Sequence, residues 1–251
     1  MWKVMGASVQ GTSHVRLGLL CQDAYDYRAI GEKGVILAVA DGLSTASKSD
    51  IGAKIAVRIA VSKIYESLYK SIPTDEKEWE ILIINGFHAV RNVLREQASS
   101  EGLKIKNYAT TLIVAVVMDS TLITGQIGDG GVVAQFENDE LSTISQPQRG
   151  EFANETMPIT TRYVFRRIRF SFPKGKIKSF ALFTDGIQSL ALELPSNTPF
   201  PPFFIPFFDA LKSTNDIKST TSSLIELLES DRVCEKTDDD KTLVVVVEEP
   251  N

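Results

Sequence analysis

Aspartates stand beside apolar segments at five places in this chain, far apart in the sequence. Four lie in short turn-like segments and the fifth leads directly into a run of valines: Asp23, Asp41, Asp129, Asp185 and Asp239. Most of these apolar segments have the pattern of strands, so each acid is expected at a strand end. Carboxylates placed repeatedly at the rim of a buried sheet need a reason to lie close together, and a hard divalent cation, which takes oxygen ligands, supplies one. The pattern predicts a metal-dependent enzyme.

Two of the acids are followed by glycine in the same context. Asp41-Gly42 and Asp185-Gly186 each follow an apolar strand and precede a helix. A single Asp-Gly pair is a common turn, so the prediction rests on the ordered set of acids. Glycine suits such a site because a backbone carbonyl can reach a metal where no side chain crowds it.

Hydrophobic periodicity indicates the elements that must position these acids. Residues 35–40 are apolar throughout, which predicts a strand covered on both faces. Helices are expected from Ser49 and from Asp75, and the second would carry His88 as a helix-surface or core residue. Further strands are expected at residues 111–118, 121–127, 132–136, 141–144, 163–172, 180–184 and the terminal valine run, and helices near 207–211 and at 222–228.

This order of elements favours an α+β domain in which helices are segregated from antiparallel strands, and at least eight candidate strands favour two packed sheets. Residues 195–206 are rich in proline and are expected to be irregular. The Pro- and Phe-rich stretch 199–208 is expected to be a buried wedge rather than an exposed contact patch. The 251 residues suffice for one large domain, so residues 1–251 are taken as a single domain.

The composition restricts the partners. A formal net charge of -5 argues against a nucleic-acid binder that neutralises phosphates, although one local run is basic: Arg162, Arg166, Arg167 and Arg169. That run is expected to be a solvated edge or a docking site for an acidic partner. The two cysteines, Cys21 and Cys234, form no short-spaced motif, and no apolar stretch approaches the ~20 residues needed to span a bilayer. A cytoplasmic protein without a membrane partner is expected.

As an ordered set, these segments resemble the metal-dependent protein phosphatase family, the PP2C-like Ser/Thr phosphatases, and especially its compact bacterial branch. The resemblance runs from residue 11 nearly to the end of the chain. The matching segments are Gly11-Thr12-Ser13-His14, Cys21-Gln22-Asp23-Ala24, Val39-Ala40-Asp41-Gly42, Ala109-Thr110-Thr111-Leu112, Ile127-Gly128-Asp129-Gly130, residues 150–156, Phe183-Thr184-Asp185-Gly186 and Asp239-Asp240-Lys241-Thr242.

The resemblance implies a four-layer α-β-β-α sandwich, in which two antiparallel sheets are flanked by helices and two Mg2+ or Mn2+ ions lie between the sheets. Asp41 would bridge the ions and Gly42 would offer its carbonyl. Asp185 and Asp239 would hold one ion, with Asp41 completing the catalytic set. Asp23 would support the other ion, Asp129 would bind a weaker third ion, and Asp240 would replace Asp239 if the register were off by one.

The resemblance also implies the chemistry. Two hard cations ~3.5–4 Å apart can lower the pKa of a bridging water while they hold the phosphate, and the resulting hydroxide attacks phosphorus in line. No cysteine nucleophile is needed, so Cys21 is expected to be structural.

Two positions depart from the pattern of better-known members. Gln22 stands where many carry a glutamate, so it could coordinate only through a neutral amide. Gly18 stands where many carry a phosphate-clamping arginine, and Arg16 or His14 could substitute. For His14, phosphate contact or general-acid work and a structural role remain equal alternatives.

The leading hypothesis is therefore a phosphatase that acts on phosphoserine or phosphothreonine of a protein substrate and opposes a Ser/Thr kinase. Gln22 and Gly18 favour a second hypothesis, a non-catalytic phosphoprotein-binding module on the same fold. A third is a two-metal hydrolase of small phosphate esters or nucleic acid, for which the acidic net charge makes nucleic acid the poorer substrate.

Overall fold

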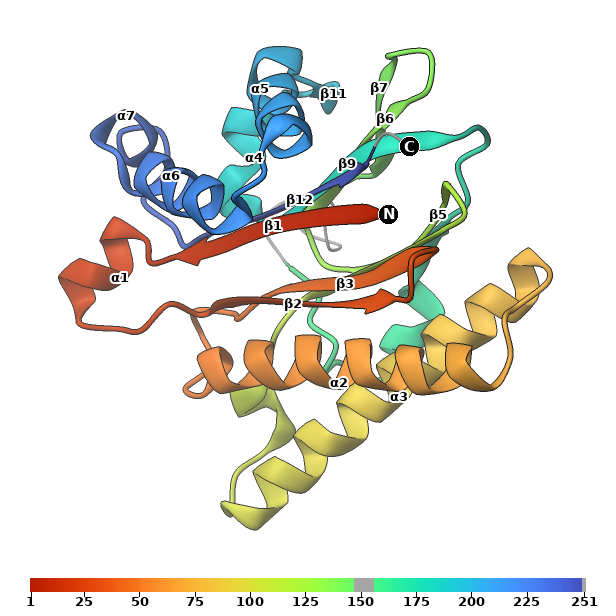
Figure 1. Ribbon diagram of the computed structural model, residues 1–251. Coiled ribbons are helices and arrows are strands. Elements are labelled where there is room, and N and C mark those ends of the chain that lie inside the picture. Colours follow the sequence, from red (N-terminus) through yellow and green to blue (C-terminus); the bar gives the residue numbers. More distant parts are fainter. Residues whose placement is uncertain (147–155, 250–251) are drawn as a thin grey trace.

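Two antiparallel sheets form the centre of the molecule in the computed structural model, which describes residues 1–146 and 156–249 (Figure 1). Within these residues each large sheet has five strands, in the orders β1-β12-β9-β6-β7 and β2-β3-β4-β5-β8. The strands of the first sheet are β1 (Trp2–Val9), β12 (Lys241–Glu248), β9 (Ile177–Phe183), β6 (Gly131–Phe136) and β7 (Leu141–Ser145). Those of the second are β2 (Asp23–Ile30), β3 (Gly34–Asp41), β4 (Leu112–Met118), β5 (Thr121–Ile127) and β8 (Arg169–Ser171). A separate small ribbon pairs β10 (Leu192–Glu193) with β11 (Thr198–Pro199).

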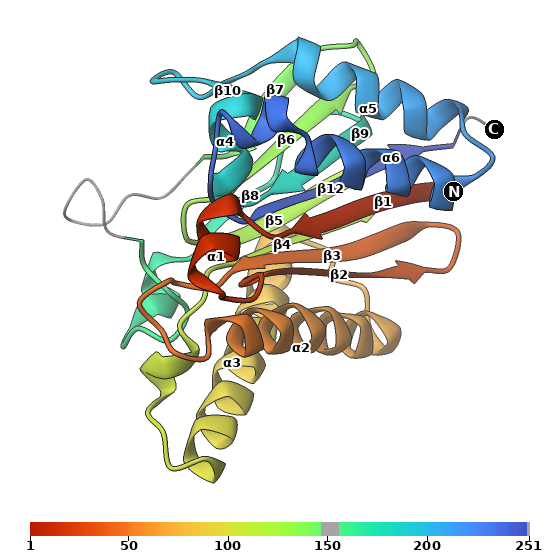
Figure 2. The same ribbon diagram turned by 90° about the vertical axis from the view of Figure 1, so that its left-hand side faces the viewer.

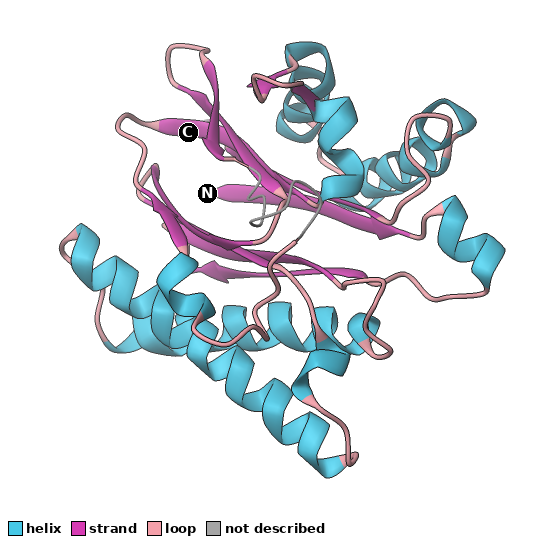
Figure 3. Cartoon of the chain, turned by 180° about the vertical axis from the view of Figure 1, so that it is seen from behind, coloured by secondary structure: helices cyan, strands magenta, loops and turns pink. Residues whose placement is uncertain are grey.

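Helices cover the outer face of each sheet (Figures 1 and 2). The long helices α2 (Ser49–Lys70) and α3 (Glu76–Ser100) lie on the second sheet. The first sheet is covered by α4 (Asp185–Ala191), α5 (Pro201–Ser213) and α6 (Ile217–Glu229), and the short α7 (Asp231–Cys234) lies against α6. A short helix, α1 (Thr12–Leu17), and two 3-10 turns, η1 (Ile105–Tyr108) and η2 (Val164–Arg167), lie in the connections. The expected four-layer α-β-β-α sandwich is confirmed (Figure 3).

The continuously apolar strands are explained by burial on both faces. Along β3, Val35, Leu37 and Val39 point into the layer between the sheets, while the alternate residues Ile36 and Ala38 pack against α2 and α3. Strand β12 divides its valines in the same way between the two layers on either side of it. Side chains of a strand alternate between faces, so a strand with an apolar layer on each side needs an apolar residue at every position.

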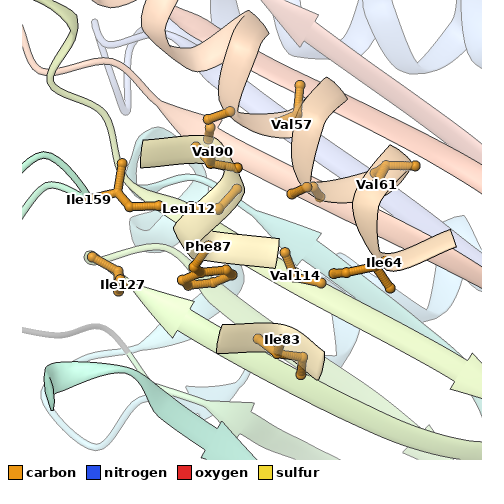
Figure 4. Close-up of a cluster of buried hydrophobic side chains, with 14 of the residues drawn as sticks. Val57, Val61, Ile64, Ile83, Phe87, Val90, Leu112, Val114, Ile127 and Ile159 are labelled. Carbon is orange, nitrogen blue, oxygen red and sulfur yellow. The ribbon is translucent and has the colours of Figure 1, made fainter. Parts of the chain in front are cut away.

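The layer between the second sheet and its helices is a buried hydrophobic core. Phe87 and Val90 of α3 meet Leu112 and Val114 of β4 there, together with Ile159 from the connection that follows β7 (Figure 4). Asp75 caps α3, because its side chain accepts a hydrogen bond from the Glu78 amide. This packing fixes the strand ends from which the site is built.

Two expectations about local structure were wrong. Residues 163–172 do not form one strand, because η2 interrupts them and only β8 pairs, with β5. Residues 195–206 are not wholly irregular, because α5 starts at Pro201, and Pro201 and Pro202 occupy its first turn, where amide hydrogens have no helical partner. In the Pro- and Phe-rich stretch 199–208, Phe204 and Phe208 are buried but Phe200 is 40% exposed, so only part of the stretch forms the expected buried wedge.

His88, the segment 150–156 and the possible membrane spans were also subjects of sequence-based expectations. His88 lies exposed on α3, with its ring 3.8 Å from the ring of Phe165, so the helix-surface alternative is confirmed. Residues 150–155 of the matching segments lie outside the described residues. Within the described part of the chain, no helix is long and apolar enough to cross a membrane.

Candidate metal centre

The acidic residues reach one rim of the sandwich from both sheets. Asp23 and Asp41 face each other at paired positions of β2 and β3. Asp185 begins α4 directly after β9, and Asp239 lies just before β12, the strand that pairs with β9. Asp129 lies in the turn between β5 of the second sheet and β6 of the first. Five acids that are distant in the sequence are thus brought to the same edge.

Three of these carboxylates form a compact group. Asp41, Asp129 and Asp185 each offer one oxygen, and the three oxygens lie within 4.8 Å of one another. Asp129 therefore sits in the closest group, whereas the resemblance reserved it for a weaker third ion. The group joins the two sheets, since Asp41 ends a strand of one and Asp185 follows a strand of the other.

The backbone of Asp41 is fixed by the two threonines before β4. Its amide donates to the Thr111 hydroxyl at 2.8 Å, and its carbonyl accepts from the Thr111 amide at 2.7 Å and from the Thr110 hydroxyl at 2.9 Å. Next to it, the Gly42 amide donates to the Gln22 carbonyl at 3.1 Å. These hydrogen bonds satisfy the backbone amide and carbonyl of Asp41 and fix the position from which its carboxylate projects at the end of β3.

Asp23 is buried and tied to the opposite sheet. Its Oδ2 accepts hydrogen bonds from the hydroxyls of Thr184 at 2.6 Å and Thr242 at 2.8 Å. The Thr242 amide also donates to the Thr184 hydroxyl at 3.0 Å, which links the ends of β9 and β12. One oxygen of Asp23 is thus occupied by these hydroxyls.

The neighbours Asp239 and Asp240 have different surroundings. Asp240 is 2% exposed, and its oxygens accept from the Gly11 amide at 2.6 Å, the Gln22 amide at 2.5 Å and His14 Nδ1 at 2.8 Å. Asp239 is exposed and its side chain accepts from the Asp240 amide. Asp239, not Asp240, is the residue of this pair with oxygen capacity left for a ligand.

Glycine is required on both sides of this aspartate pair for close approach. A Cβ on Gly186 would lie 1.9 Å from the Asp240 carbonyl oxygen, and one on Gly11 would lie 2.3 Å from the Asp239 carbonyl carbon. Both contacts are with backbone, which cannot move aside cheaply. The glycine after Asp185 therefore has a packing reason in addition to the one expected from the sequence.

The clustering raises the pKa of several of these acids. Burial raises the pKa of Asp41 well above its ordinary value, and the charges of Asp23, Asp185, Asp129 and Asp239 add to the effect. Burial, reinforced by Asp129 and Asp239, raises the pKa of Asp185 to about 7. The pKa of Asp23 is also raised by burial, against the lowering effect of its two threonine partners. A nearby cation would reverse these shifts, because it favours the ionised form.

The residues predicted to contact phosphate are placed differently from each other. His14 is buried and bonded through Nδ1 to Asp240, so it takes part in the structural network at this rim. Arg16 is exposed and pairs at 2.9 Å with Asp238, itself exposed. Gly18 ends α1 in a left-handed conformation. Burial raises the pKa of the Cys21 thiol to about 12, which keeps it protonated and agrees with a structural role.

The donor set fits a hard divalent cation. The ligand group consists of carboxylate oxygens, the donors that Mg2+ and Mn2+ prefer. Within the described residues, two buried oxygens here have no hydrogen-bond partner: Asp129 Oδ1 and Gln22 Oε1. Buried polar atoms are rarely left unpaired, and an ion or its water would satisfy both.

Comparison with known proteins agrees with this reading. Residues 10–229 match the family model described as protein phosphatase 2C. The chain is 34% identical over 256 residues to serine/threonine-protein phosphatase 3 of Escherichia coli (strain K12), covering 98% of each. In fold it is similar to the S. agalactiae serine/threonine phosphatase, with a TM-score of 0.67 at 12% identity, covering 99% of this chain and 100% of that one. It also resembles RsbX in complex with magnesium, with a TM-score of 0.55 at 15% identity, covering 98% and 94%.

The chain belongs to the protein phosphatase 2C family. It is a serine/threonine phosphatase of that type, and the enzyme is favoured over the non-catalytic binding module.

Sequence reasoning did not single out the supporting network. Thr184, Thr242 and Thr111 fix the acids, and Asp240 binds the segment around α1, but none was assigned this role. For Thr184, Asp240 and Thr242 the available signal was position, since each lies within one to three residues of a metal-ligand candidate. Thr111 is distant from all of them in the sequence and was marked only by its place in the matching segment Ala109-Thr110-Thr111-Leu112. A polar side chain beside a buried acid is expected to bond to it or to its backbone.

Proposed function

We propose that this phosphatase hydrolyses phosphoserine and phosphothreonine in proteins with a water activated at a dinuclear Mg2+ or Mn2+ centre. The observation that carries the proposal is the group formed by Asp41, Asp129 and Asp185, whose oxygens converge from two sheets. In this proposal Asp41, Asp185 and Asp239 form the catalytic set, Asp23 supports a second ion, and Gly42 and Gln22 contribute oxygen atoms. Asp129 would be a full member of the ligand set, in view of its position.

The fold positions the proposed ligand residues before any ion binds. Bound divalent cations of this kind lower the pKa of a coordinated water and offset charge on a phosphate. The carboxylates of Asp41 and Asp185 are held close by the two sheets, and the threonine bonds to Asp23 and Asp41 fix their direction. His14, held through Nδ1 by Asp240, would be oriented for phosphate contact or proton transfer through its other nitrogen.

The substrate, partner and location follow as further proposals. A phosphorylated protein, produced by a Ser/Thr kinase, is the substrate class that we propose. The RsbX complex with magnesium supports Mg2+ as one of the ions. We also propose a cytoplasmic location and a single phosphatase domain over residues 1–251, supported by two unpaired cysteines and by a family match that spans residues 10–229.

The test is metal-dependent hydrolysis of p-nitrophenyl phosphate and of a phosphothreonine peptide. Activity should require Mn2+ or Mg2+, stop on chelation, and be lost in Asp41→Asn while circular dichroism stays unchanged. The matched control is Asp26→Asn on the same strand pair, three residues beyond Asp23, which should keep full activity. Undiminished turnover by Asp41→Asn under chelation would refute the proposal.

A further inference from the structure

The segment that begins at Thr156 leads away from the acidic group. At its start, the Thr156 hydroxyl donates to the Asp129 carboxylate. Three residues later, the Ile159 amide donates at 2.8 Å to the carbonyl of Thr110, whose hydroxyl in turn holds the carbonyl of Asp41. Residues 160–169 therefore begin beside two of the three clustered aspartates.

This segment is firmly anchored on one side. Ile159 and Val164 are 0% and 1% exposed and belong to the core beneath the second sheet, where Figure 4 shows Ile159 beside Leu112 and Val90. Arg91 of α3 donates to the Thr160 carbonyl at 3.3 Å. A backbone held in this way gives fixed positions to the side chains that point outward.

The outward side carries a stack of one aromatic ring and two guanidinium groups. Arg162 and Arg166 lie over the Tyr163 ring, with their guanidinium carbons 4.7 and 5.6 Å from its centroid. Tyr163 is 61% exposed and has a φ of 62°, a left-handed conformation that is costly for a bulky residue. Strained conformations of this kind cluster at binding and active sites, and here the strained residue presents an exposed ring that two guanidinium groups contact.

The charge of this surface contrasts with the rest of the molecule. Arg162, Arg166 and Arg169 are exposed in a chain of net charge -5. Across residues 1–146 and 156–249, none of these three arginines forms an ion pair with an acidic side chain. Guanidinium groups bind carboxylates and phosphates through two parallel hydrogen bonds, so the surface is suited to acidic groups that approach from solution.

We propose that Arg162, Tyr163 and Arg166 dock acidic side chains that flank the phosphorylated residue of the substrate. This inference rests on the proposed function and adds a substrate class to it, namely phosphoproteins with acidic sequence near the phosphosite. Arg162 is six residues from Thr156, whose hydroxyl bonds to Asp129, so the Cα atoms of Thr156 and Arg162 are at most about 20 Å apart. An extended peptide covers that span in about six residues, so the recognised acids should lie within about six residues of the phosphosite, and the test places them three to five residues away.

The test measures binding separately from turnover. Two fluorescent peptides carry the same non-hydrolysable phosphonate analogue of phosphothreonine, with either Asp or Asn three to five residues away on both sides. Anisotropy gives Kd for the full chain, for the Arg162→Gln/Arg166→Gln double variant, and for its Lys counterpart. The control is Arg232→Gln, an exposed arginine on α7.

Wild-type and Arg232→Gln protein should bind the Asp peptide about tenfold more tightly than the Asn peptide. The Gln double variant should reduce that preference to about twofold, and the Lys double variant should retain part of it. Hydrolysis of p-nitrophenyl phosphate, which has no flanking residues, should be equal in all four proteins. If wild type lacks that hydrolysis, the proposed function fails, whereas the peptide preference tests the docking surface independently.

Three results would overturn the inference. Equal affinity of wild type for both peptides would show that flanking charge is not read. A parallel loss of p-nitrophenyl phosphate hydrolysis in the Gln double variant would assign the arginines to the metal centre. Binding of a single-stranded RNA oligonucleotide more tightly than the Asp peptide, abolished by the same variant, would make this a nucleic-acid surface.

Discussion

Two sets of carboxylates share one rim of the sandwich, and they differ in how their oxygens are satisfied. Asp240 is buried with three hydrogen-bond donors on its two oxygens. Asp41, Asp129 and Asp185 instead face one another, and Oδ1 of Asp129 is buried without a partner among the described residues. The oxygens of Asp240 are thus satisfied by the fold itself, whereas the clustered oxygens remain available to the proposed cation. We call Asp240 the structural set and Asp41, Asp129 and Asp185 the ion-binding set, after this proposed role.

The largest effect should follow from a change within the ion-binding set. Asp185→Asn keeps the shape of the side chain but removes a charged ligand, so turnover should fall by more than the ~10- to 100-fold typical of losing an outer-shell partner. The same variant should be more stable than wild type in chelator at pH 8, because one mutually repelling charge is gone. Thermal unfolding with and without Mn2+, beside the kinetics, measures both. A variant less stable than wild type in chelator would show that the clustered charges do not destabilise the metal-free protein, and would contradict the distinction between the two sets.

A change at Asp240, the structural set, should have the opposite balance of effects, with a large loss of stability and a smaller loss of turnover. Asp240→Ala leaves the Gly11 and Gln22 amides and His14 without their acceptor, so the free energy of unfolding should fall by ~2–4 kcal/mol in chelator. Turnover should fall by about tenfold, through the loosened Asp239 and His14. Urea denaturation checks the first effect. The exposed Asp238→Ala should be nearly neutral, and equal stability of the two variants would show that Asp240 is not structural.

The pH dependence of the metal-free protein should report the ion-binding set. The folded-state pKa of Asp185 is about 7, against an ordinary value of 3.8, so the folded state binds this proton more tightly than the unfolded state. Stability in chelator should therefore fall as the pH rises from about 4 to about 7, by a few degrees in Tm, with Asp41 and Asp23 contributing in the same direction. With saturating Mn2+ the decline should disappear. A metal-free Tm that rises over this range would contradict the raised pKa values.

The smallest effect is expected at Gln22, which lies between the two sets. The backbone amide of Gln22 donates a hydrogen bond to the Asp240 carboxylate, while its side-chain Oε1 is buried without a partner in the described part of the chain. Gln22→Glu adds a charged oxygen at that point, so Mn2+ should bind a few times more tightly, and the protein without metal should be slightly less stable. Calorimetric titration of Mn2+ gives the affinity. Unchanged or weaker binding would place Oε1 away from the ion.

The sequence was sufficient where one physical cause dominates. Burial on both faces makes a strand such as β3 continuously apolar, and the resemblance ordered the five acids that meet at the rim. The sequence was insufficient where contacts with distant parts of the chain determine the local structure. The prolines suggested irregular structure, but Pro201 and Pro202 occupy the first turn of α5. The Arg-rich segment was expected to be a strand but contains the 3-10 turn η2, where Phe165 packs on His88 of α3. The division between Asp239 and Asp240 depends on contacts with residues over two hundred positions away.

The pairing of β1 with β12 has a consequence for folding. Trp2 lies opposite Glu248, so β1 pairs with a strand that is very distant from it in the sequence. The hairpins β2–β3 and β4–β5 of the other sheet join strands that are adjacent in sequence and can form from local contacts, whereas the pairing of β1 with β12 requires the closure of a very long loop. Because the clustered acids come from both sheets, the acidic rim should be complete only after this slow, long-range pairing has formed.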